Sequence, residues 1–188
     1  MKLIISGTNR PGSYTRKVVD FVYGLYQDLN DPSEIIDLRE VPLSYNSQQT
    51  YKGPYEPGLQ TYIDKIDRAS GIIIVCPEYN GSYPGALKFF IDHWNFPRSF
   101  ESRPVALIGL GGRYGGVRPV DHLAQIFAYR NAYIFPLRVF FFNVWDQFKS
   151  ESVSQDSFEL LKSQAKGFKD FVAALEKSGL DANSRFKV

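Results

Sequence analysis

Residues 71–88 read GIIIVCPEYNGSYPGALK, and these residues give the strongest indication of the fold. It opens with a glycine and a continuous run of apolar, mostly β-branched residues that extends to Cys76. Such a run is typical of a strand that is buried on both faces of a parallel sheet. Pro77 has no N–H to donate to a neighbouring strand, and Pro84 is a residue type favoured at the first position of a helix. The stretch therefore predicts a strand, a short loop over residues 78–83 and a helix that begins at Pro84.

The same alternation continues along the chain. Further apolar runs that predict strands occupy residues 3–6, 34–38, 105–109 and 133–144. Apolar residues three or four positions apart predict helices, in segments that cover residues 18–29, 59–66, 120–127 and 158–175. Strands that alternate with helices predict an α/β fold, with a doubly wound, five-stranded parallel sheet and helices on both faces. A chain of this size usually takes the flavodoxin-like strand order 2-1-3-4-5, which is the order we expect here.

Length and composition are those of an ordinary globular chain. The 188 residues are 44% hydrophobic and 22% charged. Since domains usually contain about 100–200 residues, we expect residues 1–188 to form a single domain. The formal net charge of +2 is too small to indicate binding to nucleic acid or to an anionic membrane surface. No apolar run approaches the roughly 20 residues that cross a bilayer, so we expect no membrane insertion.

Two further features bear on location. Met1 and Lys2 lead directly into the first apolar run, without the pattern of a signal peptide. The lone Cys76 cannot form an internal disulfide bond. We therefore expect a cytoplasmic protein.

The loops after the first, third and fourth predicted strands meet at the carboxyl edge of the sheet, where such folds bind ligands. After the first strand, residues 6–15 read SGTNRPGSYT and lead into a helix, whose N-terminus favours anions. The hydroxyl groups of Thr8, Ser13 and Thr15 can donate hydrogen bonds to a phosphate, and Arg10 can add a charge-assisted contact. This loop predicts a phosphate site. The plainer alternative is a polar turn in which Ser13 caps the helix and Arg10 is solvated.

The loop over residues 78–83 is bounded at both ends by proline, so its backbone is restrained. Backbone N–H groups from Glu78 to Gly81 suit the polar edge of a planar heteroaromatic ring such as a flavin. Tyr79 and Tyr83 can stack against such rings. The alternative is a tight turn at Asn80-Gly81 that serves only the fold.

A glycine cluster at residues 109–116, GLGGRYGG, follows the fourth predicted strand. The dinucleotide-binding fingerprint follows the first strand and has a different spacing, so this cluster does not indicate a classical dinucleotide fold. The chain also contains no Walker sequence. A receiver-type fold is disfavoured because it needs acidic residues at the end of the first strand and an aspartate that accepts a phosphoryl group after the third, and neither is present.

Two of these loops resemble the signature motifs of the NAD(P)H-dependent FMN reductase family, which includes flavodoxin-like quinone, azo-dye and chromate reductases. Residues 7–15, GTNRPGSYT, look like the family's G-S-x-R-x-x-S-x-N loop. Residues 77–88, PEYNGSYPGALK, closely resemble its P-E-Y-N-x-S-x-P-G-x-L-K signature. Two positions depart from the pattern: Thr8 replaces a serine and keeps the hydroxyl group, whereas Thr15 replaces an asparagine.

The resemblance implies FMN as the cofactor and NAD(P)H as the co-substrate, with hydride passing through the flavin to a small-molecule electron acceptor. Around the FMN phosphate and ribityl chain it places Thr8, Arg10, Ser13, Tyr14 and Thr15. Along the isoalloxazine edge it places Pro77, Glu78, Tyr79, Asn80 and Gly81. On the third side of the site it places Gly111, Gly112 and Arg113. Because the cofactor carries the chemistry, we expect no catalytic side chain, and we find no spacing of metal ligands.

Other reactive residue types are expected to have structural roles. His93 and His122 lie on predicted helices away from the three loops, and Cys76 ends a buried strand. Arg113 and Arg118 are candidates for contact with the 2′-phosphate of NADPH. 

The sequence allows more than one prediction for the oligomeric state and for the biochemical function. The aromatic cluster at Phe89-Phe90 and at residues 93–96 is more than one helix face can bury, so we expect a homodimer or a homotetramer. A crowded core is the alternative. An FMN electron carrier with no substrate turnover is the second functional hypothesis, although such carriers usually present an acidic face. A binding protein without FMN is the third.

Overall fold

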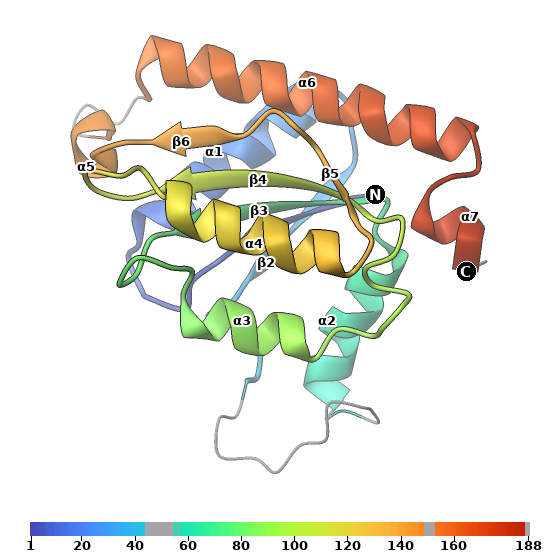
Figure 1. Cartoon of the computed structure of the whole chain (residues 1–188). Coiled ribbons are helices and arrows are strands. Elements are labelled where there is room, and N and C mark those ends of the chain that lie inside the picture. Colours follow the sequence, from blue (N-terminus) through green and yellow to red (C-terminus); the bar gives the residue numbers. More distant parts are fainter. Residues whose placement is uncertain (44–54, 56, 149–152, 187–188) are drawn as a thin grey trace.

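The computed structural model describes residues 1–43, 55, 57–148 and 153–186, and within them six strands form one parallel sheet (Figure 1). The strands are β1 (Lys2–Ser6), β2 (Ser33–Asp37), β3 (Gly71–Pro77), β4 (Pro104–Leu110), β5 (Tyr133–Ile134) and β6 (Val139–Phe141). Their order is β2-β1-β3-β4-β5, and β6 also pairs with β4. The predicted flavodoxin-like order is therefore confirmed.

The predicted strand over residues 133–144 is wrong as a single strand. It is divided into β5 and β6, which pair in succession with the two ends of β4, from Pro104↔Tyr133 to Leu110↔Phe141. Pro136 stands between them and cannot donate to the ladder. The buried amide of Gln164 instead donates to the carbonyl oxygens of Leu107 and Leu137, at 3.1 and 2.8 Å. A side chain thus satisfies the carbonyl groups at the interruption.

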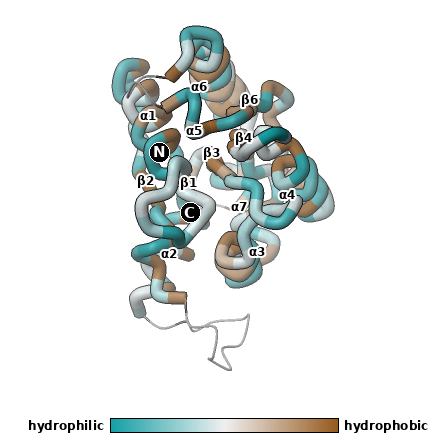
Figure 2. The backbone as a smooth tube through the Cα atoms, turned by 90° about the vertical axis from the view of Figure 1, so that its left-hand side faces the viewer, coloured by the Kyte–Doolittle hydropathy of each residue, from teal (hydrophilic) through white to brown (hydrophobic). Residues whose placement is uncertain are grey.

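Helices cover both faces of the sheet (Figure 2). Their bounds are α1 (Tyr14–Asp28), α2 (Pro57–Arg68), α3 (Gly85–Asp92), α4 (Val117–Tyr129), α5 (Val144–Gln147), α6 (Gln155–Lys177) and α7 (Ala182–Phe186). Helices α2, α3 and α4 pack on one face, whereas α1, α5 and α6 pack on the other. The five predicted helices are confirmed, and the short helices α5 and α7 were not expected. None of the helices in the described ranges has both the length and the apolarity that a bilayer-spanning segment requires.

The strands lie between the two helical layers, and this explains their continuous apolar runs. In β1, Leu3 and Ile5 contact the α2–α4 layer, whereas Ile4 contacts the α1–α6 layer. All three side chains are fully buried. Successive side chains of a strand point to opposite faces, so a strand covered on both sides needs apolar residues at every position.

Two predicted helix starts differ in detail from the structure. Ser13 is the N-cap residue of α1, as expected, but its side chain makes no capping hydrogen bond. Pro84 is the N-cap of α3, not its first helical residue, because its ψ of 142° is extended. Its carbonyl oxygen nevertheless accepts hydrogen bonds from the backbone N–H groups of Leu87 and Lys88.

The glycine cluster after β4 allows the backbone of α4 to approach the sheet closely. Gly116 has a φ of +79°, and a Cβ atom there would lie 2.4 Å from the backbone nitrogen of Leu110. A Cβ atom on Gly109 would lie 2.6 Å from the carbonyl oxygen of Gly116. These glycines therefore pack the start of α4 against the end of β4.

Substitution of Gly116 tests this packing. Gly116→Ala adds both a steric overlap and a strained backbone, so we expect the free energy of unfolding to fall by about 1–3 kcal/mol or more. Denaturant unfolding followed by circular dichroism measures the change. Gly24→Ala is the control, since Gly24 lies within α1 and a Cβ atom there would have no neighbour within 4 Å. We expect Gly24→Ala to be neutral or stabilising. Equal stability of Gly116→Ala and the wild type would contradict the packing argument.

Candidate active site

A cleft of about 320 Å³ lies at the carboxyl edge of the sheet, between the loops that follow β1, β3 and β4 and the start of α5. This is the edge toward which the β4 and β6 arrows point in Figure 1, and α3 and α4 begin there. The cleft is lined by Arg10, Gly12, Ser13, Tyr14, Thr15, Pro77, Glu78, Tyr79, Leu110, Gly111, Gly112, Val144 and Trp145. Nine of the thirteen predicted site residues are therefore brought together at one place.

One end of the cleft is suited to an anion. The N-terminus of α1 supplies unpaired backbone N–H groups and the positive end of the helix dipole. Since the Ser13 side chain makes no capping hydrogen bond, its hydroxyl group is available to a ligand. Arg10 is exposed and makes no ion pair within the described part of the chain, so its guanidinium group is available as well.

Thr8 braces the site and does not line the cleft. It is 1% exposed, and its hydroxyl oxygen lies 2.9 Å from the hydroxyl oxygen of Tyr79. The same oxygen accepts a hydrogen bond from the backbone N–H of Arg10 at 3.2 Å. Thr8 therefore links the loop after β1 to the loop after β3, whereas the sequence predicted a direct contact with phosphate.

The loop over residues 78–83 is partly as predicted. Glu78 and Tyr79 line the cleft, but their backbone N–H groups already donate to the carbonyl oxygens of Leu110 and Ser82, at 2.9 and 2.8 Å. The expectation that these two N–H groups face a ligand is therefore wrong. Asn80 and Gly81, with φ of 52° and 79°, form the tight turn that was the alternative reading, and neither lines the cleft.

Glu78, which lines the cleft, is held by an ion pair with Arg118. Arg118 donates to Oε1 of Glu78 at 2.6 Å, and this hydrogen bond raises the pKa of Arg118. The guanidinium carbon of Arg118 also lies 3.8 Å from the centre of the Tyr114 ring. Oε2 of Glu78 is buried without a partner among the described residues. The pair fixes the carboxylate and offsets its charge.

Trp145 is a wall of the cleft that the sequence analysis missed. It lies on α5 and is 46% exposed, and a Cβ atom on Gly112 would lie 2.8 Å from its ring. The backbone N–H groups of Asn143 and Val144 donate to the carbonyl oxygens of Gly112 and Gly111, at 2.9 and 3.0 Å, and so place α5 against the loop after β4. A tryptophan directly after the last apolar run, at the same edge of the sheet, was the available signal.

The remaining candidates lie away from the cleft wall. Arg113 is exposed at the rim and does not line the cleft. His122, expected to be remote from the loops, in fact lies with its Nδ1 atom 2.8 Å from the hydroxyl oxygen of Ser82. It also packs edge-on against Tyr83, which lines a different cavity. Cys76 is fully buried, and burial raises the pKa of its thiol, so the structural role predicted for it is supported.

Comparison with known proteins agrees with this geometry. Residues 1–147 match the NADPH-dependent FMN reductase family. An FMN-dependent NADPH-azoreductase of Staphylococcus saprophyticus is 33% identical over 127 residues, which are 66% of this chain and 67% of that protein. An NAD(P)H:quinone oxidoreductase of Solanum tuberosum is 30% identical over 158 residues, 81% of each protein.

A solved structure shows the same fold. The flavoenzyme NAD(P)H:(acceptor) oxidoreductase of Paracoccus denitrificans superposes with a TM-score of 0.72 at 18% identity, over 92% of this chain and 96% of that one. At this identity the likeness concerns the fold, while the sequence matches carry the assignment. The chain belongs to the NADPH-dependent FMN reductase family.

Proposed function

We propose that this FMN-dependent NAD(P)H oxidoreductase binds its flavin in the cleft and reduces a small acceptor such as a quinone, an azo compound or free flavin. The observation that carries the proposal is the convergence of nine motif residues, from three loops far apart in the sequence, on one cleft. Family membership supports the cofactor and the co-substrate.

The residues at the α1 end of the cleft fit the FMN phosphate. Arg10 supplies a guanidinium group, Ser13 supplies an unengaged hydroxyl group, and the helix N-terminus supplies N–H groups. Thr15, which replaces the family's asparagine, is almost fully buried beside them and contributes a smaller hydroxyl group. Thr8 positions this loop through Tyr79.

The other end of the cleft fits a flat aromatic ring system. The lining includes the apolar or aromatic side chains of Pro77, Leu110, Val144 and Trp145. Tyr14, the first residue of α1, adds a ring at the helix end of the cleft. Such walls exclude water and offer stacking surfaces, as ligand pockets usually do.

The protein's part in the reaction is binding and positioning. Bound FMN supplies the chemistry, which is acceptance of hydride from NAD(P)H and its donation to the acceptor. Of the titratable side chains on the cleft wall, Glu78 is paired with Arg118 and the Tyr79 hydroxyl group is bonded to Thr8. These two groups are therefore committed to the architecture of the site. The alternative of an electron carrier without its own turnover is not favoured, since the relatives found by sequence are reductases.

We also propose a domain organisation and a cellular compartment for this chain. We take residues 1–188 to act as one FMN-binding domain, supported by the single sheet that both helical layers share. We place the enzyme in the cytoplasm, with NAD(P)H as its reductant. The support is a free, buried Cys76, which suits a reducing compartment.

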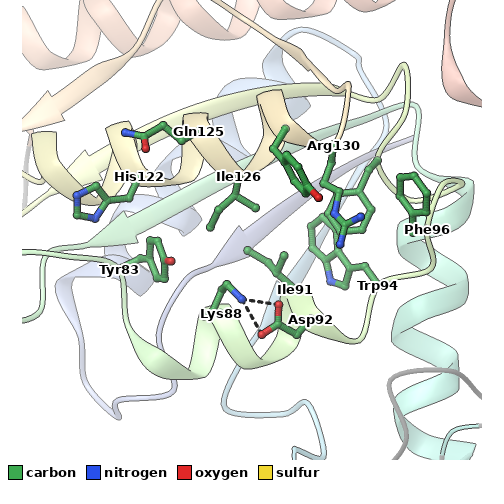
Figure 3. Close-up of a pocket in the computed structure, with 12 residues that line it drawn as sticks. Tyr83, Lys88, Ile91, Asp92, Trp94, Phe96, His122, Gln125, Ile126 and Arg130 are labelled. Atoms are coloured by element: carbon green, nitrogen blue, oxygen red, sulfur yellow. Dashed lines mark hydrogen bonds and ion pairs between the residues drawn. The ribbon is translucent and has the colours of Figure 1, made fainter.

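A second copy of the chain is the proposed partner, in a homodimer or a homotetramer. Between α3 and α4 lies a groove of about 490 Å³, shown in Figure 3 with side chains of both helices facing one another. Phe96 and Tyr129 line it and are 57% and 79% exposed. Phe90, His93 and Trp94 belong to the core, so the alternative of a crowded core describes that part of the aromatic cluster.

The charges around this groove suit self-association. Lys88 and Arg130 are cations on its wall, and Asp92 is an anion that forms an ion pair with Lys88 (Figure 3). In a twofold dimer each patch meets its own copy, so a patch that carries both signs can pair unlike charges across the interface. The exposed rings of Phe96 and Tyr129 supply apolar area for the same contact.

The first test of function is loading with FMN. We expect the apoprotein to bind FMN, become yellow, and then oxidise NADPH or NADH continuously when a quinone or an azo dye is present. The chain has two tryptophans, and Trp94 is buried whereas Trp145 lines the cleft. FMN should therefore quench much of the fluorescence of the wild type and less of that of Trp145→Phe. A protein that stays colourless with excess FMN would contradict the proposal.

Removal of Arg10 tests the phosphate end of the cleft. Arg10→Ala should weaken FMN binding by about tenfold to hundredfold, because a hydrogen bond to a charged group contributes about 1.5–3 kcal/mol. Fluorescence titration measures the dissociation constant. Riboflavin, which lacks the phosphate, should show a much smaller change. Arg68→Ala, which removes an exposed arginine at the end of α2, is the matched control and should bind FMN as the wild type does. An unchanged FMN affinity in Arg10→Ala would remove Arg10 from the site.

The assembly is tested by light scattering after size-exclusion chromatography. We expect the wild type to be at least a dimer, and Tyr129→Glu or Phe96→Glu to shift it toward the monomer, since each change buries a charge at the interface. Leu160→Glu is the control, because Leu160 is 48% exposed on the opposite helical layer. A monomeric wild type at micromolar concentration would rule out this interface.

A further inference from the structure

The loop between β4 and α4 carries two arginines around one tyrosine just outside the cleft. The Tyr114 ring is 48% exposed. The guanidinium carbon of Arg118 lies 3.8 Å from the ring centre, and that of Arg113 lies 5.7 Å from it. This cluster, Arg113–Tyr114–Arg118, is cationic and aromatic, and it lies beyond the residues that line the cleft.

The two arginines differ in their availability. Arg118 is committed to Glu78 by the ion pair at 2.6 Å. Arg113 is exposed, and it makes no ion pair with any residue in the described ranges. Arg118 is therefore held by Glu78, whereas the guanidinium group of Arg113 is exposed beside the Tyr114 ring without a carboxylate partner among the described residues.

The position of Arg113 is set by its neighbours in the chain. Gly111 and Gly112, which line the cleft, directly precede it. Gly115 and Gly116, both with positive φ, follow it and pack against Phe142 and the end of β4. The loop then enters the N-terminus of α4, whose dipole adds positive potential at the same rim. Arg113 thus extends from a loop that is anchored on both sides.

We propose that Arg113, with Tyr114 beside it, binds the 2′-phosphate of NADPH and makes the enzyme prefer NADPH to NADH. The inference rests on the proposed function, because a flavin in the cleft is what brings the nicotinamide there. The nicotinamide end must reach the flavin, so the adenosine end extends across the rim of the cleft. NADPH and NADH differ only in the 2′-phosphate, and discrimination therefore needs a cation at that end.

The chemistry of the cluster matches this group. A guanidinium fork binds a phosphate through two parallel hydrogen bonds, and arginine is the residue that accommodates a 2′-phosphate in other nucleotide folds. The exposed Tyr114 ring offers a flat surface for ribose or adenine. Arg113 does not line the cleft, so this role replaces the contact with FMN that the motif resemblance assigned to it.

Fragments of the two nucleotides provide the test with a readout other than turnover. Calorimetry with the FMN-loaded protein compares adenosine 2′,5′-bisphosphate with adenosine 5′-monophosphate. We expect the wild type to bind the bisphosphate about tenfold or more tightly, and Arg113→Ala to lose most of that difference. Arg113→Lys should retain part of it, because it keeps the charge without the fork. Arg68→Ala is the matched control for the loss of one exposed positive charge and should keep the full difference.

Steady-state kinetics give a second readout. The ratio of KM for NADH to KM for NADPH should fall in Arg113→Ala and should stay at the wild-type value in Arg68→Ala. Equal binding of the two fragments by the wild type, or an undiminished preference in Arg113→Ala, would overturn the inference. Failure of the proposed function is a different result, because the protein would then bind no FMN at all. Failure of this inference alone would leave FMN binding intact and the two fragments bound equally.

Discussion

Strand β3 is the element on which the site depends, because it pairs in parallel with β1 on one side and with β4 on the other and is buried on both faces. Parallel pairing makes all three strands end at one edge of the sheet. The loops that follow them are therefore neighbours, although they are far apart in sequence. Any change that shifts the register of β3 would separate the two walls of the cleft from each other.

Contacts among the loops themselves maintain the shape of the cleft. Thr8 is linked to Tyr79, the N–H of Glu78 to the carbonyl group of Leu110, and the N–H of Val144 to that of Gly111. Each of these hydrogen bonds joins two different segments of the chain at the carboxyl edge of the sheet. These hydrogen bonds restrain the loops through the protein's own groups, which lowers the entropic cost of binding a ligand in the cleft.

Most residues of the motif resemblance line one cleft, but the structure gives some of them contacts that the motif did not predict. Arg10, Ser13, Glu78 and Gly112 line the cleft as expected. Thr8 instead makes a buried hydrogen bond to another loop, and Trp145 was missed. Neither outcome is visible in a motif, because each depends on which distant residue lies opposite. The groove between α3 and α4 combines side chains from two helices, so it too could not be predicted from a sequence motif.

The alternation of strands and helices and the loops that carry the site could be predicted from the sequence alone, since hydrophobic periodicity and proline positions act locally. The strand order was only an expectation from chain size. The tertiary structure was needed to show that residues 133–144 form two short strands, that His122 contacts Ser82, and that Arg118 pairs with Glu78 while Arg113 has no carboxylate partner among the described residues. These features are contacts between residues distant in sequence, and their geometry follows from how the layers pack.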